Sequence, residues 1–307
     1  MIAPTLLFGF ALTQVFPVGG TGKWDYVTVD SASSRVFLTR GSHTQVVSAR
    51  DGSVLADIPG QSHNHGVALV PALGRGFISD GGDAAVVIFD LASYRVLGRV
   101  PAADDADGII YDPASGRVFV GCGDSRCVVP IPAGIDPAHG APDPRIALPG
   151  QPEFLAADGR GRLYVNLVDQ NRVAVIDSRS LRVLTTWPTA PGGRPTGLSL
   201  DPAGEHLFVG CRAPRQLIVL RCRDGSVAAH FPIGMGVDAT RCFGGRAFAS
   251  CRDGTLTVIA ADGDHFRPDQ IVATRPGART MGDDPATSTL YLPTAEGGRF
   301  ELLVVTP

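Results

Sequence analysis

The sequence repeats one short pattern seven times, and this repetition constrains the fold more than any other feature. Each copy begins with a polar or charged residue and continues with apolar residues, usually followed by an Asp, as in residues 24–30 and 196–201. Equivalent positions are 25, 66, 107, 153, 196, 238 and 279, so the copies lie 41 to 46 residues apart. A period near 40 residues with several short strands is typical of a β-propeller blade. The sequence therefore predicts an all-β, seven-bladed β-propeller.

The fourth copy shows how one blade is built. Four β-forming segments, 154–157, 162–166, 172–177 and 181–187, are separated by residues typical of turns. This order predicts a four-stranded antiparallel meander. The second segment of every copy has an aromatic residue in its third position, which we expect to pack between blades. These residues are Phe37, Phe77, Phe119, Tyr164, Phe208, Phe248 and Tyr291.

The last copy is one strand short. The chain ends soon after residues 300–305, and an unassigned strand-like segment, residues 13–18, precedes the first copy. We therefore expect the N-terminal strand to complete the last blade, because this pairing removes two open sheet edges. On this interpretation residues 1–307 form a single domain, and we expect a monomer.

Composition excludes some functions and leaves the compartment open. The net charge is −3, from 27 basic and 30 acidic residues, so no basic footprint for nucleic acid is present. No apolar run is long enough to span a bilayer. Residues 1–12 are apolar. The protein is exported if these residues belong to a trimmed signal peptide, and it is cytoplasmic if they form a strand.

The starts of the first strands define a candidate site. In a propeller these strands begin at one mouth of the central channel, where side chains from all blades converge. The residues predicted to bind a ligand at this mouth are Trp24, Asp25, His65, Asp107, Glu153, Thr196, Asp238, Arg279 and Thr280. Carboxylates crowded together bind a cation, retain a proton or pair with a base. We expect a divalent metal ion with His65, Glu153 and Asp238 as ligands. The alternative is that Asp25, Asp107 and Asp238 only cap turns.

Three cysteines occupy one equivalent position after the second strand, namely Cys122, Cys211 and Cys251. Because no CxxC pair is present, a zinc ribbon is not predicted, and we expect these thiols to fill space between blades. Arg212 and Arg252 follow two of them. They either bind an anion at the mouth or lie in solvent.

Several segments in register with the repeat, among them Trp24-Asp25-Tyr26, Pro152-Glu153-Phe154 and Phe208-Val209-Gly210-Cys211-Arg212, resemble the YncE-like, YVTN-repeat family of bacterial β-propellers. The resemblance covers residues 16–294 and implies the propeller fold. It implies no activity, because members are mostly exported proteins without an assigned one.

Three functions remain open. The first is binding of a small molecule, metal ion or peptide at the channel mouth. The second is a metal-assisted lyase or lactonase that uses the same carboxylates and His65. The third is a scaffold in which the carboxylates are turn caps. The chain has no P-loop, HExxH or GxSxG motif, so nucleotide hydrolysis, zincin proteolysis and α/β-hydrolase chemistry are not supported.

Overall fold

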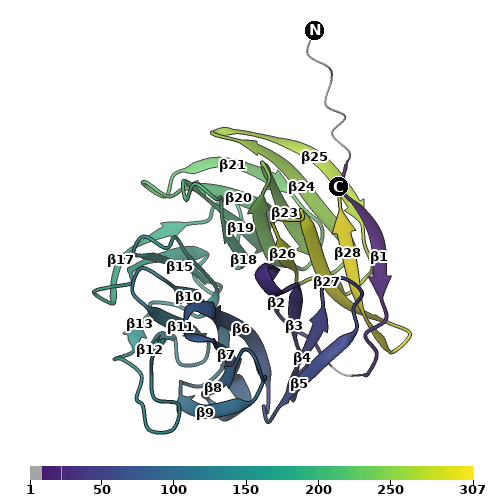
Figure 1. Cartoon of the computed structure of the whole chain (residues 1–307). Coiled ribbons are helices and arrows are strands. Elements are labelled where there is room, and N and C mark those ends of the chain that lie inside the picture. Colours follow the sequence, from purple (N-terminus) through teal and green to yellow (C-terminus); the bar gives the residue numbers. More distant parts are fainter. Residues whose placement is uncertain (1–8, 22) are drawn as a thin grey trace.

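A computed structural model describes residues 9–21 and 23–307. Over these residues it contains seven four-stranded antiparallel sheets, which surround a central channel (Figure 1). The prediction of an all-β, seven-bladed propeller is therefore confirmed. The only helical elements described are three short 3₁₀ turns, η1 (Ser31–Ser33), η2 (Pro71–Leu73) and η3 (Gly81–Asp83). Within the described residues, no helix has the length and apolarity needed to cross a membrane.

In each blade the strands are given in order from the central channel to the outer edge. Blade 1 contains β2 (Val27–Asp30), β3 (Arg35–Thr39), β4 (His43–Ser48) and β5 (Val54–Pro59). Blade 2 contains β6 (Asn64–Val70), β7 (Arg75–Asp80), β8 (Ala85–Asp90) and β9 (Val96–Pro101). Blade 3 contains β10 (Ala106–Asp112), β11 (Arg117–Cys122), β12 (Cys127–Pro132) and β13 (Ile146–Ala147). Blade 4 contains β14 (Pro152–Ala157), β15 (Arg162–Leu167), β16 (Arg172–Asp177) and β17 (Arg182–Pro188).

The remaining blades follow the same order. Blade 5 contains β18 (Pro195–Leu200), β19 (His206–Arg212), β20 (Arg215–Arg221) and β21 (Val227–Pro232). Blade 6 contains β22 (Val237–Phe243), β23 (Arg246–Cys251), β24 (Thr255–Asp262) and β25 (His265–Ala273). Blade 7 contains β26 (Gly282–Asp284), β27 (Thr289–Glu296), β28 (Arg299–Thr306) and β1 (Ala11–Phe16). The longest repeat spacing falls in blade 3, where residues 133–145 separate β12 from the two-residue β13.

The apolar core is divided among the seven junctions between neighbouring blades. One cluster, for example, joins Phe37 and Val46 of blade 1 to Ile78 and Phe89 of blade 2. The seven aromatic residues predicted to pack between blades are all at most 4 % exposed, which confirms that prediction. A single blade has no such partner surface, so burial of these residues depends on the complete ring.

Buried hydroxyl groups join the inner strands across the same junctions. The Thr39 hydroxyl donates to the carbonyl of His65 at 2.8 Å, and the Ser250 hydroxyl donates to that of Ala278 at 2.7 Å. Both side chains are fully buried, so these bonds satisfy polar groups that would otherwise be costly. Neighbouring blades are therefore held by apolar packing and by a few hydrogen bonds near the channel.

The two ends of the chain build blade 7 together. β1 pairs antiparallel with β28 and forms the outermost strand, so the predicted closure by an N-terminal strand is confirmed (Figure 1). Phe10 packs edge-on against Phe248, with ring centroids 4.9 Å apart. Phe16 packs against Gly52, where a Cβ atom would lie 2.3 Å from the Cβ of Phe16. Residues 1–8, which the prediction of one domain also includes, lie outside the described residues.

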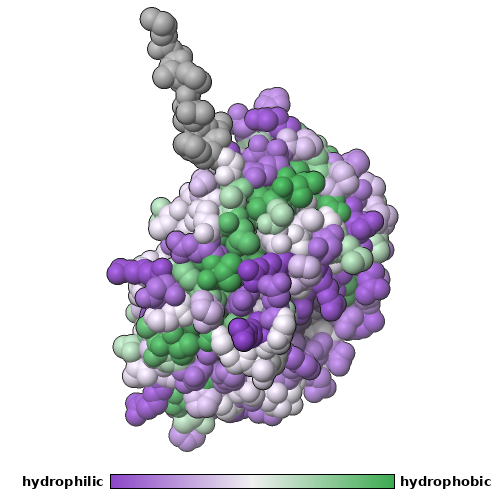
Figure 2. Space-filling model, turned by 90° about the vertical axis from the view of Figure 1, so that its right-hand side faces the viewer, coloured by the Kyte–Doolittle hydropathy of each residue, from purple (hydrophilic) through white to green (hydrophobic). Residues whose placement is uncertain are grey.

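Exposed apolar side chains lie mainly on the outermost strands. They include Leu55 on β5, Leu184 on β17 and Ile271 on β25. On the side of the molecule that carries β1 and β28, apolar surface occurs as separate patches between hydrophilic residues (Figure 2). The three strands named belong to blades 1, 4 and 6.

Replacement of Phe16 tests the closing strand. We expect Phe16→Ala to lower the free energy of unfolding by about 3 kcal/mol, because it removes a buried ring from the junction of blades 7 and 1. Gln14→Ala changes an exposed residue on the same strand and should alter stability by less than about 0.5 kcal/mol. Urea unfolding measures both. Equal, small effects would mean that β1 does not seal the ring.

Candidate ligand site at the channel mouth

A cavity of about 570 Å³ lies at one mouth of the channel. Its lining residues are Asp25, Tyr26, His65, Asp107, Glu153, Arg212, Gly236, Asp238, Arg252 and Arg279. Every blade contributes to it: Asp25 and Tyr26 directly precede β2 of blade 1, Arg279 precedes β26 of blade 7, and the others lie on blades 2 to 6 or their loops. The repeat thus brings charged side chains from across the chain into one small volume.

A repeated irregularity positions these side chains. The pairing of the inner strand with its neighbour shifts at the same place in blades 2 to 6, between Asn64 and Val67 in blade 2 and between Ala106 and Ile109 in blade 3. The residues within these shifts include His65, Asp107, Glu153, Thr196 and Asp238. A β-bulge bends the strand and turns a side chain away from the regular alternation. It therefore gives the four charged residues of this set their common position at the mouth.

His65 joins two carboxylates. Its Nδ1 lies 2.7 Å from Asp25 Oδ2 and 3.3 Å from Asp107 Oδ1. Burial alone would lower the pKa of His65, but the hydrogen bond that its Nδ1 donates to Asp25 and the charges of Asp107 and Asp25 raise it to about 9. Burial raises the pKa of Asp107 well above its usual range, against the opposing charge of His65. His65 Nε2 and Asp107 Oδ1 are buried and have no hydrogen-bond partner within the part of the chain described.

The same three residues offer metal ligands. Asp25, His65 and Asp107 can each contribute one ligand atom, and these atoms lie within 4.8 Å of one another. Of the expected ligands His65, Glu153 and Asp238, only His65 belongs to this group. Asp238 differs because it is already engaged: Arg279 Nε donates to it at 2.7 Å, and Arg212 Nη2 also donates to it.

Glu153 is the carboxylate with a pKa near neutrality. Burial and the charge of Asp238 raise its pKa to about 7, although Arg212 acts in the opposite direction. The pKa of Asp238 is also raised, mainly by burial, while Arg212 and Arg279 oppose the shift. The mouth therefore contains an imidazolium between two carboxylates, a carboxylate between two guanidinium groups, and a carboxyl group that exchanges its proton near pH 7.

The other predicted residues lie elsewhere. Trp24 lines an adjoining cavity of about 390 Å³ together with His63 and Asn64. Thr196 and Thr280 are fully buried and do not line the cavity. The Thr196 hydroxyl donates to Val237 O at 2.9 Å, and that of Thr280 donates to Asp25 O at 2.8 Å. Their short side chains reach a neighbouring carbonyl, so they join blades, and the structure does not place them on the wall of this cavity.

Sequence reasoning did not select Tyr26, and it left two alternatives for Arg212 and Arg252. Both arginines line the cavity, where Arg212 is half-buried and Arg252 is exposed. Tyr26 follows Asp25 and also lines a second cavity at the opposite end of the channel. Its apolar ring gave no signal of a site, because aromatic residues in this repeat mostly pack between blades.

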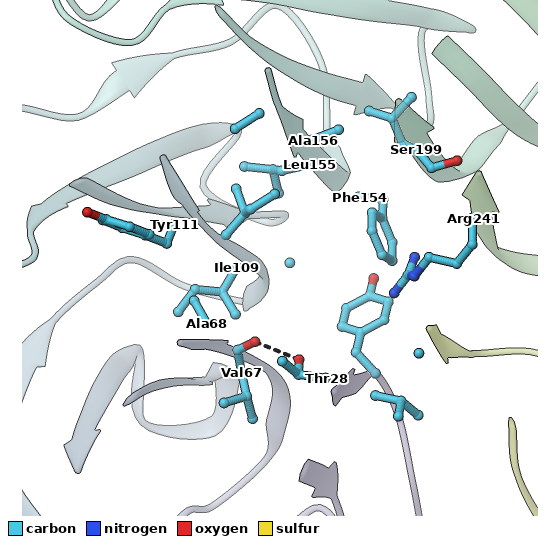
Figure 3. A pocket seen from close by; sticks show the side chains of 18 of the residues that line it. Thr28, Val67, Ala68, Ile109, Tyr111, Phe154, Leu155, Ala156, Ser199 and Arg241 are labelled. Carbon is cyan, nitrogen blue, oxygen red and sulfur yellow. Dashed lines mark hydrogen bonds between the residues drawn. The ribbon is translucent and has the colours of Figure 1, made fainter. Parts of the chain in front are cut away.

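The second cavity is mostly apolar and has a volume of about 470 Å³. Ile109, Leu155 and Ala156 face it, and the Thr28 hydroxyl on its wall donates to Val67 O (Figure 3). Arg241 supplies a charge, but Asp283 binds it at 2.8 Å. The two cavities thus differ in chemistry, charged at one mouth and apolar at the other, and Tyr26 borders both.

Comparison with solved structures supports the fold. U3-55K matches with a TM-score of 0.84 and 11 % identity, covering 97 % of this chain and 100 % of that one. Hydrazine synthase from Kuenenia stuttgartiensis matches with a TM-score of 0.79 and 15 % identity, covering 92 % and 95 %. The Cps50 (Swd1) β-propeller domain from Myceliophteria thermophila matches with a TM-score of 0.73 and 13 % identity, covering 97 % and 100 %.

No family model and no curated protein sequence matches the chain. At these low identities the matches establish a β-propeller and carry no function. The YncE-like assignment remains a prediction from the segments quoted above.

The pKa of Glu153 predicts a pH-dependent stability. An unfolded Glu has a pKa of about 4.3, so between about pH 4.5 and 7 the folded chain binds more protons than the unfolded chain. The free energy of unfolding should therefore fall as pH rises through this window. Glu153→Gln removes the ionisable group, so we expect it to be more stable than the parent by about 3 kcal/mol at pH 8, and similar to it at pH 4.5.

Urea unfolding at the two pH values measures this difference. Glu205→Gln, at an exposed glutamate, is the matched control, and it should change the free energy of unfolding by the same amount at both pH values. If Glu153→Gln gives the same stability change at pH 4.5 and pH 8, the carboxyl group does not titrate in this window.

Proposed function

We propose that this protein is a YncE-like binding propeller that holds a small ligand at the channel mouth through a divalent metal ion. The observation that carries the proposal is the cluster of Asp25, His65 and Asp107, whose ligand atoms lie within 4.8 Å of one another. His65 Nε2, which is buried without a hydrogen-bond partner among the described residues, supports it, because such groups are costly when buried without a partner.

The donor set suits a hard or borderline ion. Two carboxylates and one imidazole favour Mn²⁺, Fe²⁺ or Zn²⁺ over soft metals. An ion on these residues must compete with the proton of His65, because the nitrogen that binds a metal gives up its proton. With three protein residues coordinating the ion, further coordination positions stay open for water or for the bound small molecule, as in metal sites that bind substrates.

The surrounding charges indicate the kind of ligand. Arg212, Arg252 and Arg279 line the same cavity as the three proposed metal ligands. An anionic oxygen placed between the ion and these guanidinium groups would meet positive charge on both sides. We therefore infer that the ligand is a small molecule with a carboxylate or a similar oxyanion. The single chain, residues 1–307, would act as one domain and as a monomer.

A metal-assisted enzyme of the lyase or lactonase type is the second candidate. Its support is Glu153, because a group with a pKa of about 7 can both accept and release a proton at neutral pH. In this alternative the ion would polarise a carbonyl or carboxylate of the substrate and Glu153 would move the proton. His65 would remain a metal ligand.

Titration with Mn²⁺ tests the metal site. We expect isothermal titration calorimetry to detect one ion per chain, and Asp107→Asn to weaken its binding at least tenfold, since it removes a charged ligand. Asp269→Asn, at a carboxylate that pairs with Arg246 on the outer part of blade 6, should leave the affinity unchanged. Unaltered binding in Asp107→Asn, or no binding by the parent protein, would contradict the proposal.

Turnover of a panel of lactones and hydroxy acids in the presence of Mn²⁺ separates the two candidates. If the enzyme alternative holds, Glu153→Gln should lower kcat by about 100-fold while the Mn²⁺ affinity stays the same. Binding of Mn²⁺ without turnover of any member leaves the binding function as the better account.

A further inference from the structure

Two cysteines in blade 3 face each other across neighbouring strands. Cys122 ends β11, Cys127 begins β12, and the two residues are direct partners in the antiparallel register. Both belong to the apolar cluster between blades 2 and 3, with exposed fractions of 0 % and 4 %. Their side chains therefore lie on the same face of the sheet, and both are free thiols in this structure.

The register determines how these thiols can react. Pro130 and Pro132 on β12 lie opposite Phe119 and Arg117 on β11. Because proline has no N–H to donate, these are the non-hydrogen-bonded pairs, and alternation makes Cys122 and Cys127 a hydrogen-bonded pair. Cα atoms in such a pair are about 5.5 Å apart, which a disulfide can span. Since the Cβ atoms are farther apart than a disulfide prefers, the bridge would be strained and easily reduced.

Other blades provide an internal comparison. Cys211 and Cys251 occupy the position of Cys122 in blades 5 and 6, but their cross-strand partners are Gln216 and Thr255. Burial raises the pKa of each of these thiols to about 12, so they are unreactive. Blade 3 alone among the described blades pairs this position with a second thiol.

The paired thiols differ in acidity. The neighbouring Cys122 lowers the pKa of Cys127, and the charge of Arg145 acts in the same direction, against burial and Asp104. The neighbouring Cys127 and burial raise the pKa of Cys122, whose Sγ donates to Val120 O. Cys127 is also the more exposed of the two, at 4 % against 0 %, so it is the nucleophile of the pair, and Cys122 is placed to react with it afterwards.

We propose that Cys122 and Cys127 form a reversible disulfide when the folded protein meets a peroxide. The Cys127 thiolate attacks one peroxide oxygen, the O–O bond breaks, and the departing oxygen takes a proton to leave as water. The sulfur of Cys122 then attacks the Cys127 sulfenic acid, losing its proton as the S–O bond breaks and a second water leaves. In total two thiols and one hydrogen peroxide give one disulfide and two waters. A thiol reductant reverses the reaction by exchange.

Peptide mapping tests this site, because Arg126 lies between the two cysteines. The folded protein is treated with hydrogen peroxide at pH 7.5, denatured, blocked with N-ethylmaleimide and digested with trypsin. We expect residues 118–126 to be recovered linked to residues 127–145, while Cys211 and Cys251 carry the maleimide. Dithiothreitol added to the folded protein after oxidation should separate the linked peptides.

Variants distinguish the pair from the lone thiols. Cys127→Ser should abolish the linked peptide and leave Cys122 blocked by maleimide, whereas Cys211→Ser, at an equivalent position in blade 5, should not change its yield. The proposal is overturned if Cys122 and Cys127 of the parent protein stay reduced at a peroxide dose that oxidises free glutathione. It is also overturned if the linked peptide forms only after denaturation. Neither result depends on metal binding at the channel mouth.

Discussion

The site depends on seven inner strands that can meet on one axis only when the ring is closed. Each junction between blades buries its own apolar cluster, and β1 supplies the strand that completes the last one. Once the ring is closed, a bulge at the same point of five inner strands turns residues such as His65, Asp107 and Glu153 toward the mouth. Packing at the junctions thus fixes a charged cluster whose carboxylates repel one another.

Much of the charge at the mouth is compensated within the protein. His65 lies between Asp25 and Asp107, and Asp238 lies between Arg212 and Arg279. Compensation is incomplete, because Glu153 and Asp107 both have raised pKa values. Such a site resists the loss of further protons and gains stability from a bound cation. The same imbalance that costs stability in the free protein thereby favours a ligand.

The sequence was sufficient for the architecture and for part of the site. The repeat period predicted seven blades, and the missing last strand predicted the role of β1, because both follow from counting strands. Because His65 and Glu153 have the same position within their copies of the repeat, the sequence also predicted that they share a cavity. It could not separate Thr196 from Asp238, since whether a short side chain reaches a neighbouring carbonyl depends on the distance between blades. The sequence also did not predict which charged residues form ion pairs, because these pairs join residues of different blades.

The proposed metal site depends on the phase of the repeat, which brings Asp25, His65 and Asp107 together. Anomalous diffraction from crystals grown with Mn²⁺ locates a bound ion without reference to any activity. We expect one strong anomalous peak at the channel mouth, in contact with at least one carboxylate oxygen of the cluster and with a ring nitrogen of His65. An occupied mouth without an anomalous peak, or Mn²⁺ bound only at the outer surface, would contradict the account.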